Sequence, residues 1–387
     1  MKGRAAIILL AAIFVFTVTG SPQAAEPIKL GAFFALSGPN AHIGTPTKLV
    51  AEMVVDKINK GGGINGRPLQ LIIGDTESDP AKAATIAKKF IHSDKVAAII
   101  GPTSTGEGMQ VKKIVEEAGI PTFMTVGGDP PIMEQTGPFT YIFKSPQRSS
   151  TAVKKVFGYL KDKKLTKVAL MYATDPFGKD GVVWLKKLAP DFGITFVAEE
   201  SFGPKDIDMT AQLTKIKAAK PQAIVVWTIG PAGAIVAKNK VQVGLNIPLF
   251  QCHGQPDPTY IKLAGKASEG DRMPATKLMA AAQLDDKDPQ KPVIKEFIRL
   301  YTDEYKFDKQ FPLNTHSGYA WDAIIIVANA MKKAGTDPKK LREAIEQTKG
   351  YVGVSGIYNI TPQDHNGLDV DSMVIVQVKG GKFVLAD

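Results

Sequence analysis

The sequence feature that most constrains the fold is an alternation of short apolar runs with longer amphipathic stretches, which continues along the chain after the first 26 residues. The short runs, such as 96–100, are rich in Val, Ile and Leu, a composition typical of parallel strands that are buried on both faces. The longer stretches carry apolar residues at helical spacing, as in 46–60 with Val50, Met53 and Val54. This alternation predicts an α/β fold with doubly wound sheets.

The alternation occurs in two blocks, which an irregular segment at 127–138 separates. In the first block we expect strands at 28–36, 69–74, 96–100 and 121–125, and helices at 46–60, 80–93 and 105–118. In the second block we expect strands at 167–172, 195–200, 223–228 and 249–251, and helices at 149–161, 181–192, 209–219 and 231–243. Three helices (289–305, 317–334, 338–348) and short strands near 357–360, 373–378 and 383–385 follow. We therefore expect two doubly wound α/β lobes.

The N-terminus has the layout of a secretory signal peptide. Lys2 and Arg4 precede an uncharged apolar run at 5–19, and small residues follow up to Ala25. The apolar run is too short to cross a bilayer comfortably. We predict that residues 1–25 are removed and that the mature protein is periplasmic; an uncleaved N-terminal anchor is the alternative.

The charge balance and the cysteine count exclude several classes of protein. The formal charge is +10, but only six of the 48 basic residues are Arg, and the Lys residues are scattered over predicted helix faces. Because recognition of phosphates and bases favours Arg, we expect a solvated surface and no nucleic-acid partner. The single cysteine, Cys252, excludes a disulfide framework and a cysteine-based zinc site.

Motifs for catalysis and cofactor binding are missing. Gly61, Gly63 and Gly66 have the spacing of a dinucleotide fingerprint, but they follow a predicted helix and precede a strand, the reverse of what that site requires. We interpret them as a helix end and a turn. The sequence has no nucleophile elbow, no phosphate-binding loop and no metal-binding histidine pair. We predict no enzyme activity, no cofactor and no metal.

A candidate anion site follows the strand at 96–100. The segment 101–106, Gly-Pro-Thr-Ser-Thr-Gly, lies where open α/β sheets bind ligands and leads into a helix. Its hydroxyls and the free N–H groups of the first helical turn can bind an anion. Simple capping of the helix by Ser or Thr is the alternative.

Several strings, taken together and in order, carry a resemblance to a known family. They are Leu-Ser-Gly-Pro at 36–39, Ile-Asn-Lys-Gly-Gly-Gly-Ile-Asn-Gly-Arg at 58–67, Ser-Asp-Pro at 78–80, Ile-Gly-Pro at 100–102, Glu-Ala-Gly-Ile-Pro at 117–121, Phe-Gly at 177–178, Leu-Ala-Gly at 263–265 and Ser-Glu-Gly at 268–270. Over essentially the whole mature chain, the sequence resembles the leucine/isoleucine/valine-binding family of periplasmic solute-binding proteins, which serve ABC transporters.

The resemblance implies a type I periplasmic-binding-protein fold, whose two lobes close on a small molecule about a hinge of three crossings. We place the crossings near 145–148, 274–276 and 353–357. The first lobe would be 26–146 plus 275–355, and the second 147–274 plus 356–387. The implied function is that of a monomer that binds its ligand and delivers it to an ABC permease in the membrane. A ligand-sensing input protein of a signalling system is the alternative.

The resemblance also implies ligand-binding positions. The hydroxyls that hold a ligand carboxylate correspond to Ser104 and Thr105. A segment at the end of a strand corresponds to Val126, Gly127 and Gly128. The apolar or aromatic side chains from both lobes correspond to Ile43, Phe177, Trp227 and Ile229. The position of the family's ammonium-binding glutamate corresponds to His253.

The sequence matches the family's carboxylate-binding half better than its ammonium-binding half. His253 replaces an acid, and Gly128 replaces a threonine. Burying an ammonium group without a carboxylate or several acceptors is unfavourable. Asp129 could supply the missing charge if its side chain points inward. A branched-chain or other aliphatic amino acid and a hydrophobic or aromatic monocarboxylate therefore both stay open as ligands.

Overall fold

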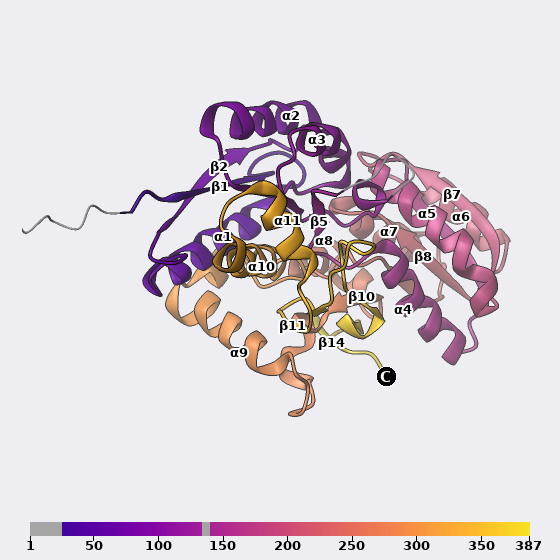
Figure 1. Ribbon diagram of the computed structural model, residues 1–387. Coiled ribbons are helices and arrows are strands. Elements are labelled where there is room, and N and C mark those ends of the chain that lie inside the picture. The colour runs from indigo at the N-terminus through magenta and orange to yellow at the C-terminus, as the bar shows by residue number, and fades with distance from the viewer. Residues whose placement is uncertain (1–24, 134–139) are drawn as a thin grey trace, which may run out of the picture.

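A computed structural model describes residues 25–133 and 140–387 (Figure 1). Apart from Ala25, the predicted signal peptide lies outside the described residues. The chain forms two large sheets, each covered by helices on both faces, and a small hairpin. No helix in the described part of the chain has the length and apolarity that a membrane span needs. The prediction of two doubly wound α/β lobes is confirmed.

The first sheet is wholly parallel and has the order β2-β1-β3-β4-β5. Its strands are β1 (Ile28–Phe34), β2 (Leu69–Asp75), β3 (Ala98–Ile100), β4 (Thr122–Met124) and β5 (Ile142–Lys144). One face packs against α1 (Ala41–Lys60), α9 (Lys291–Arg299), α10 (Tyr319–Ala334) and α11 (Pro338–Glu346). The other face packs against α2 (Pro80–Lys89) and α3 (Thr105–Glu117). Helices far apart in the sequence, purple α1 and orange-gold α9 to α11, therefore lie side by side (Figure 1).

Burial on both faces explains the continuous apolar runs of these strands. In β1, Leu30 and Phe34 point into the core beneath α1 and α10, whereas Phe33 points into the core beneath α2 and α3. None of the three side chains is more than 1 % exposed. Since neighbouring side chains in a strand point to opposite faces, a strand covered twice needs apolar residues at every position.

The second sheet has the order β14-β13-β10-β9-β8-β6-β7, and β13 runs antiparallel to both of its neighbours. Its strands are β6 (Lys167–Ala173), β7 (Thr195–Phe202), β8 (Ala223–Trp227), β9 (Leu249–Gln251), β10 (Arg272–Thr276), β13 (Met373–Lys379) and β14 (Lys382–Leu385). On one face lie α4 (Ser149–Asp162) and α5 (Pro176–Leu188). On the other lie α6 (Thr210–Ala218), α7 (Pro231–Gln242) and α8 (Pro258–Ala264).

The chain passes between the two sheets three times. It passes from β5 to α4, from β10 towards α9, and from the hairpin of β11 (Tyr351–Val352) and β12 (Ile357–Tyr358) to β13. The second expected crossing, 274–276, lies inside β10, so the passage follows that strand. The third, 353–357, falls in the hairpin, and Tyr358, Ile360 and Leu368 still pack in the core of the first sheet.

Two helices begin earlier than the sequence pattern predicts. We expected the first helix to start at Pro46, because proline favours the first turn, but α1 starts at Ala41 and holds Pro46 inside. We expected α5 to start at Gly181, but it starts at Pro176, since the Asp175 carboxylate caps it by accepting from the Gly178 N–H at 2.7 Å. β5, α8 and β10 were not predicted.

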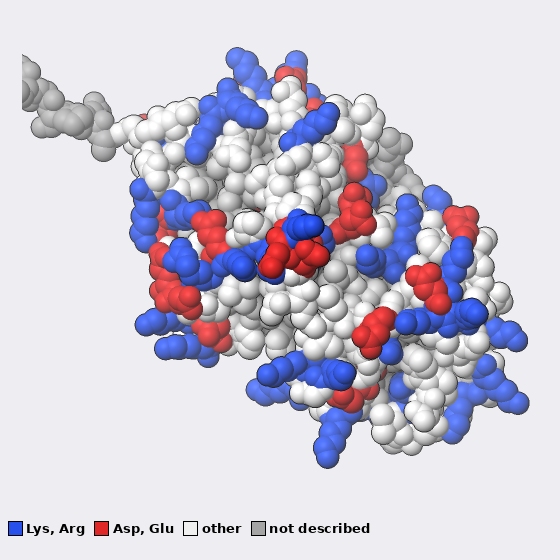
Figure 2. Space-filling model, turned by 90° about the horizontal axis from the view of Figure 1, so that it is seen from below, with Lys and Arg blue, Asp and Glu red and all other residues white. Residues whose placement is uncertain are grey.

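Charged side chains on the face seen in Figure 2 are mixed in sign. Lys and Arg side chains are spread over this face, with Asp and Glu side chains between them. This face carries no single-sign basic patch of the kind that a nucleic-acid-binding surface needs.

Candidate ligand-binding site

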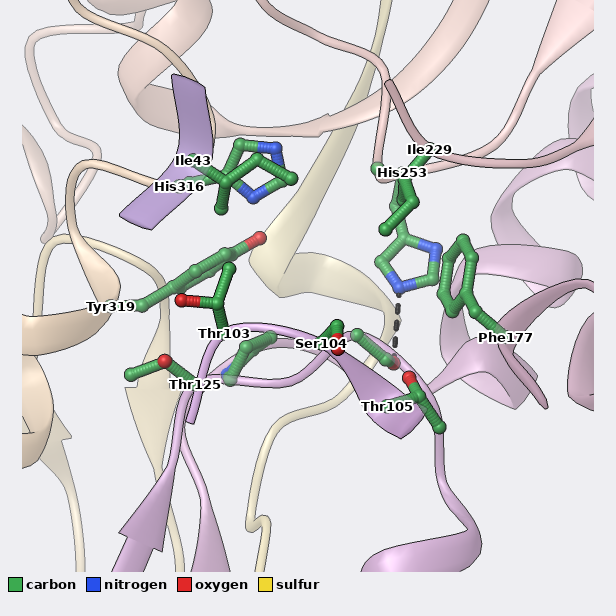
Figure 3. A pocket seen from close by; sticks show the side chains of 13 residues that line it. Ile43, Thr103, Ser104, Thr105, Thr125, Phe177, Ile229, His253, His316 and Tyr319 are labelled. Atoms are coloured by element: carbon green, nitrogen blue, oxygen red, sulfur yellow. Dashed lines mark hydrogen bonds between the residues drawn. The ribbon is translucent and has the colours of Figure 1, made fainter. Parts of the chain in front are cut away.

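A cavity lies between the two lobes, at the carboxyl ends of strands from both sheets (Figure 3). The first lobe, including the segment before α10 and the first residue of that helix, contributes Ile43, Thr103, Ser104, Thr105, Thr125, Gly127, Pro146, His316 and Tyr319. The second lobe contributes Phe177, Ile229, His253 and Gly254.

Three consecutive hydroxyls line the cavity, and each already accepts a hydrogen bond from a backbone N–H. The Ala35 N–H donates to Thr103 Oγ1 at 3.0 Å, the Glu107 N–H to Ser104 Oγ at 3.3 Å, and the Gly128 N–H to Thr105 Oγ1 at 3.0 Å. A hydroxyl has one proton to donate. Among the residues that the structure describes, none of the three hydroxyls donates a hydrogen bond, so each has a proton available for a ligand.

The local structure that places these hydroxyls is the start of α3. Ser104 is the N-cap, and Glu107 completes a capping box by accepting from the Ser104 N–H at 2.7 Å. The Glu107 carboxylate is buried and also accepts from the Thr76 hydroxyl, which fixes the cap to the loop after β2. The capping interpretation and the anion-site interpretation of 101–106 are therefore both compatible with the structure, because capping uses only the acceptor side of the Ser104 hydroxyl.

The wall across from the hydroxyls is apolar and comes mostly from the second lobe. Phe177 lies on the first turn of α5, and Ile229 follows β8. Ile43, on the first turn of α1, adds an aliphatic side chain from the first lobe. Trp227 lies behind this wall, with its ring centroid 6.1 Å from that of Phe177.

His253 connects the two lobes. Its Nε2 lies 3.3 Å from the Gly127 carbonyl oxygen and donates to it, so the hydrogen bond runs from the second lobe to the first (Figure 3). Burial, reinforced by the charge of Lys144, lowers the pKa of His253 to about 3, and the imidazole is neutral at physiological pH. One of the two acceptor positions of the Gly127 carbonyl oxygen is therefore occupied by His253.

Most of the predicted site residues meet at this cavity: Ile43, Ser104, Thr105, Gly127, Phe177, Ile229 and His253 line it. Three others lie next to it. Val126 is fully buried in the core beneath α2 and α3, Gly128 donates its N–H to Thr105, and Trp227 is fully buried behind Phe177.

Asp129 does not point into the cavity. Its carboxylate accepts from the Ser149 N–H at 3.0 Å, at the start of α4, and lies 3.5 Å from Lys144 Nζ. Its own N–H donates to Asp180 Oδ2 on α5 at 3.0 Å. Asp129 thus stabilises the α4 N-terminus from the first lobe, and it cannot serve as the partner of a ligand ammonium.

Sequence reasoning missed several lining residues, among them Thr125, His316 and Tyr319. Thr103 lies in the predicted anion-binding segment 101–106, although the resemblance did not imply it as a ligand-binding position. His316 and Tyr319 come from a segment about 200 residues further along, and no local pattern connects it with the other lining residues.

The cavity carries no formal charge of its own. Its described lining contains no Asp, Glu, Lys or Arg. Burial, reinforced by the charge of His42, lowers the pKa of His316 to about 3, and burial raises the pKa of Tyr319 well above its usual value, so both side chains are neutral. Hydrogen bonds and apolar contacts therefore determine what binds.

Comparison with known proteins identifies the family. The family model described as "Periplasmic binding protein" matches residues 27–382. The chain belongs to this family. The leucine-, isoleucine-, valine-, threonine- and alanine-binding protein of Pseudomonas aeruginosa is 27% identical over 342 residues, which are 87% of this chain and 87% of that protein.

Solved structures with the same fold cover almost the whole chain. The extracellular ligand-binding receptor of Rhodopseudomonas palustris HaA2 is 26% identical, with a TM-score of 0.85 over 94% of this chain and 100% of that chain. A branched-chain amino acid transporter substrate-binding protein from Streptococcus pneumoniae, in complex with isoleucine, is 23% identical. Its TM-score is 0.79, over 93% of this chain and 99% of that chain. The expected family, the type I fold and a binding function rather than an enzymatic one are confirmed.

Proposed function

We propose that this protein is the periplasmic solute-binding component of an ABC importer, and that it binds a small hydrophobic or aromatic monocarboxylate in the cavity between its lobes. The observation that carries the proposal is the row Thr103, Ser104 and Thr105, whose hydroxyls all have a proton available in a cavity whose described lining has no acidic side chain. Family membership supports the transport role and the periplasmic location.

The hydroxyl row suits a carboxylate. Hydrogen bonds to charged groups stabilise a complex by about 1.5–3 kcal/mol each, roughly twice the value for neutral partners. Thr105 is the first residue of α3, whose unpaired N–H groups and dipole add to the attraction for an anion. The ligand's carboxylate thus replaces water on these donors when the lobes close.

The same cavity is poorly suited to an ammonium group. The Gly127 carbonyl is bonded to His253, the Thr105 oxygen is bonded to the Gly128 N–H, and Asp129 faces Lys144. A buried ammonium group would lack a carboxylate partner, which is strongly unfavourable. A branched-chain amino acid is the second candidate, favoured by the name of the Pseudomonas aeruginosa relative.

Binding is proposed to occur by closure of the two lobes. Contacts that join them, such as His253 to Gly127 and Asp129 to Asp180, support this mechanism. The cores support first-lobe limits of 26–146 plus a later part that ends near Leu368, and a second lobe that comprises the rest. The protein would act as a monomer and present the closed form to a permease; an input protein for signalling would close in the same way.

The test is a calorimetric titration of benzoate, 3-phenylpropanoate, 4-methylpentanoate, leucine, isoleucine and valine. We expect the monocarboxylates to bind and leucine to bind at least tenfold more weakly than 4-methylpentanoate, which has the same carbon skeleton without the ammonium group. Thr105→Val should weaken monocarboxylate binding by about 10–100-fold through the loss of a charge-assisted hydrogen bond, and Thr105→Ser should retain affinity.

The matched control is Thr85→Val, since Thr85 is exposed on α2 and its hydroxyl donates only within that helix. It should leave affinity unchanged. Tight binding of leucine together with no binding of 4-methylpentanoate would overturn the monocarboxylate proposal in favour of the amino acid.

A further inference from the structure

His316 has a buried ring nitrogen without a protein partner. The residue precedes α10 and is 7% exposed, and its Nε2 has no hydrogen-bond partner among the residues that the structure describes. Its backbone is fixed, because the His316 N–H donates to Asn314 Oδ1 at 3.0 Å. Buried polar atoms in folded proteins are almost always bonded, so an exception that lines a cavity points to a ligand.

The His316 ring faces the cavity together with Tyr319. Figure 3 shows both side chains on the side away from Phe177 and His253, with His316 across the cavity from Thr105. The two rings meet edge to face, with centroids 5.8 Å apart. A ligand whose carboxylate lies on Ser104 and Thr105 therefore extends towards His316.

The charge state of this end of the cavity restricts what can bind there. Both His316 and Tyr319 are neutral, and the described lining holds no charged side chain. A second carboxylate or an ammonium group at this end would be buried without a counter-charge. A purely apolar group would leave the His316 nitrogen unbonded. The other nitrogen of the neutral His316 ring donates to the backbone of Gly254, so Nε2 is an acceptor. An uncharged donor, such as a hydroxyl, satisfies both conditions.

We propose that the ligand carries a hydroxyl at the end remote from its carboxylate, and that His316 selects this hydroxyl by accepting its hydrogen bond at Nε2. This inference rests on the proposed function, since it deepens the description of the monocarboxylate. The ligand class is then hydroxy-substituted hydrophobic monocarboxylates, and His316 is a specificity-determining residue.

The experiment compares ligands that differ only at this position. Calorimetry on the purified mature protein measures benzoate, 3-methylbenzoate, 4-methylbenzoate, 3-hydroxybenzoate and 4-hydroxybenzoate, and the corresponding 3-phenylpropanoates. Each methyl compound matches the hydroxyl compound with the same substitution position in size. We expect at least one hydroxyl compound to bind about tenfold or more tightly than its methyl counterpart.

Variants of His316 connect the preference to this residue. His316→Leu should abolish the preference while leaving affinity for the methyl compounds within about threefold, and His316→Gln should retain part of it. Thermal unfolding of each variant checks that it folds; if His316→Leu does not, the comparison uses His316→Gln and His316→Phe.

The possible failures are distinguishable. Equal binding of methyl and oxygen-bearing compounds by the wild-type protein overturns the inference and leaves the proposed function intact. An oxygen preference that survives in His316→Leu or His316→Phe also overturns it. Failure of every monocarboxylate to bind overturns the proposed function, and the inference with it.

Discussion

The substitution Gly127→Ala should weaken ligand binding without weakening the fold of either lobe. Gly127 follows β4 in the first lobe and meets the second lobe directly. A Cβ added there would lie 2.8 Å from Phe177 Cε2, closer than real Cβ atoms approach, and 3.5 Å from His253 Nε2. Both of these neighbours belong to the second lobe and line the cavity. The methyl group therefore obstructs the closed form and is free in the open form.

The substitution is expected to weaken ligand binding but to stabilise the unliganded protein. An overpacked contact costs about 1–3 kcal/mol, which corresponds to about 5–150-fold weaker binding when the cost arises only on closure. Gly127 is not at a positive φ, so its backbone conformation tolerates alanine when Phe177 is not packed against it. Its reduced freedom in the unfolded chain then stabilises the unliganded protein by about 0.4–1 kcal/mol.

Titration calorimetry with the tightest monocarboxylate measures the first effect, and urea unfolding without ligand measures the second. The matched control is Gly158→Ala in α4, because a Cβ at Gly158 has no heavy atom within 4 Å. This control should leave affinity unchanged and stabilise the helix. Unchanged affinity in Gly127→Ala would refute the reasoning, since it would mean that the closed contact with Phe177 does not form.

Two further predictions concern the buried charges between the lobes. Asp129→Ala should destabilise the protein by about 3–5 kcal/mol in urea unfolding, because it leaves the fully buried Lys144 ammonium without its carboxylate. Burial, and then the nearby Asp129 charge, raise the pKa of Asp180 from 3.8 to about 7. Between pH 4 and 7 the native state therefore binds more protons at Asp180 than the unfolded state, so this group lowers the free energy of unfolding as pH rises, by up to about 4 kcal/mol. Asp180→Asn should flatten that pH profile.

The control for both predictions is Asp162→Asn at an exposed position of α4. It should change neither the free energy of unfolding nor its pH dependence by more than about 0.5 kcal/mol. A loss below 1 kcal/mol for Asp129→Ala would contradict the role of the ion pair. A pH profile of Asp180→Asn that runs parallel to the wild-type profile would contradict the raised pKa of Asp180.

Features of the fold that depend on local patterns could be predicted from the sequence. Burial on both faces of β1 requires an apolar run, and the run is visible in the sequence. The start of α1 could not be predicted, because Pro46 is a strong local signal for a helix start and the preceding turn has no side-chain cap. β10 contains Pro274 and pairs on one side with β13, about 100 residues later in the chain, which its own residues do not indicate.

The candidate site also contains some residues whose role could be predicted from the sequence and others whose role could not. Ser104 and Thr105 were predictable because the loop, the helix start and the hydroxyls are contiguous in sequence. The direction of the Asp129 side chain was not predictable, because it depends on contacts with Lys144 and with the start of α4. Whether Trp227 lines the cavity or lies behind it depends on Phe177, which lies on α5 after the neighbouring strand β6, about 50 residues earlier in the chain.

The order of the strands in the second sheet determines when this protein can fold. β10 is an interior strand only because β13, about 100 residues later in the chain, pairs with its outer side. The first sheet, similarly, is covered on one face by α9, α10 and α11, which follow its last strand by about 150 residues. While the chain is synthesised from its N-terminus, both sheets expose unpaired edges or uncovered apolar faces. Folding of either lobe can therefore be completed only after the distant segments have been added.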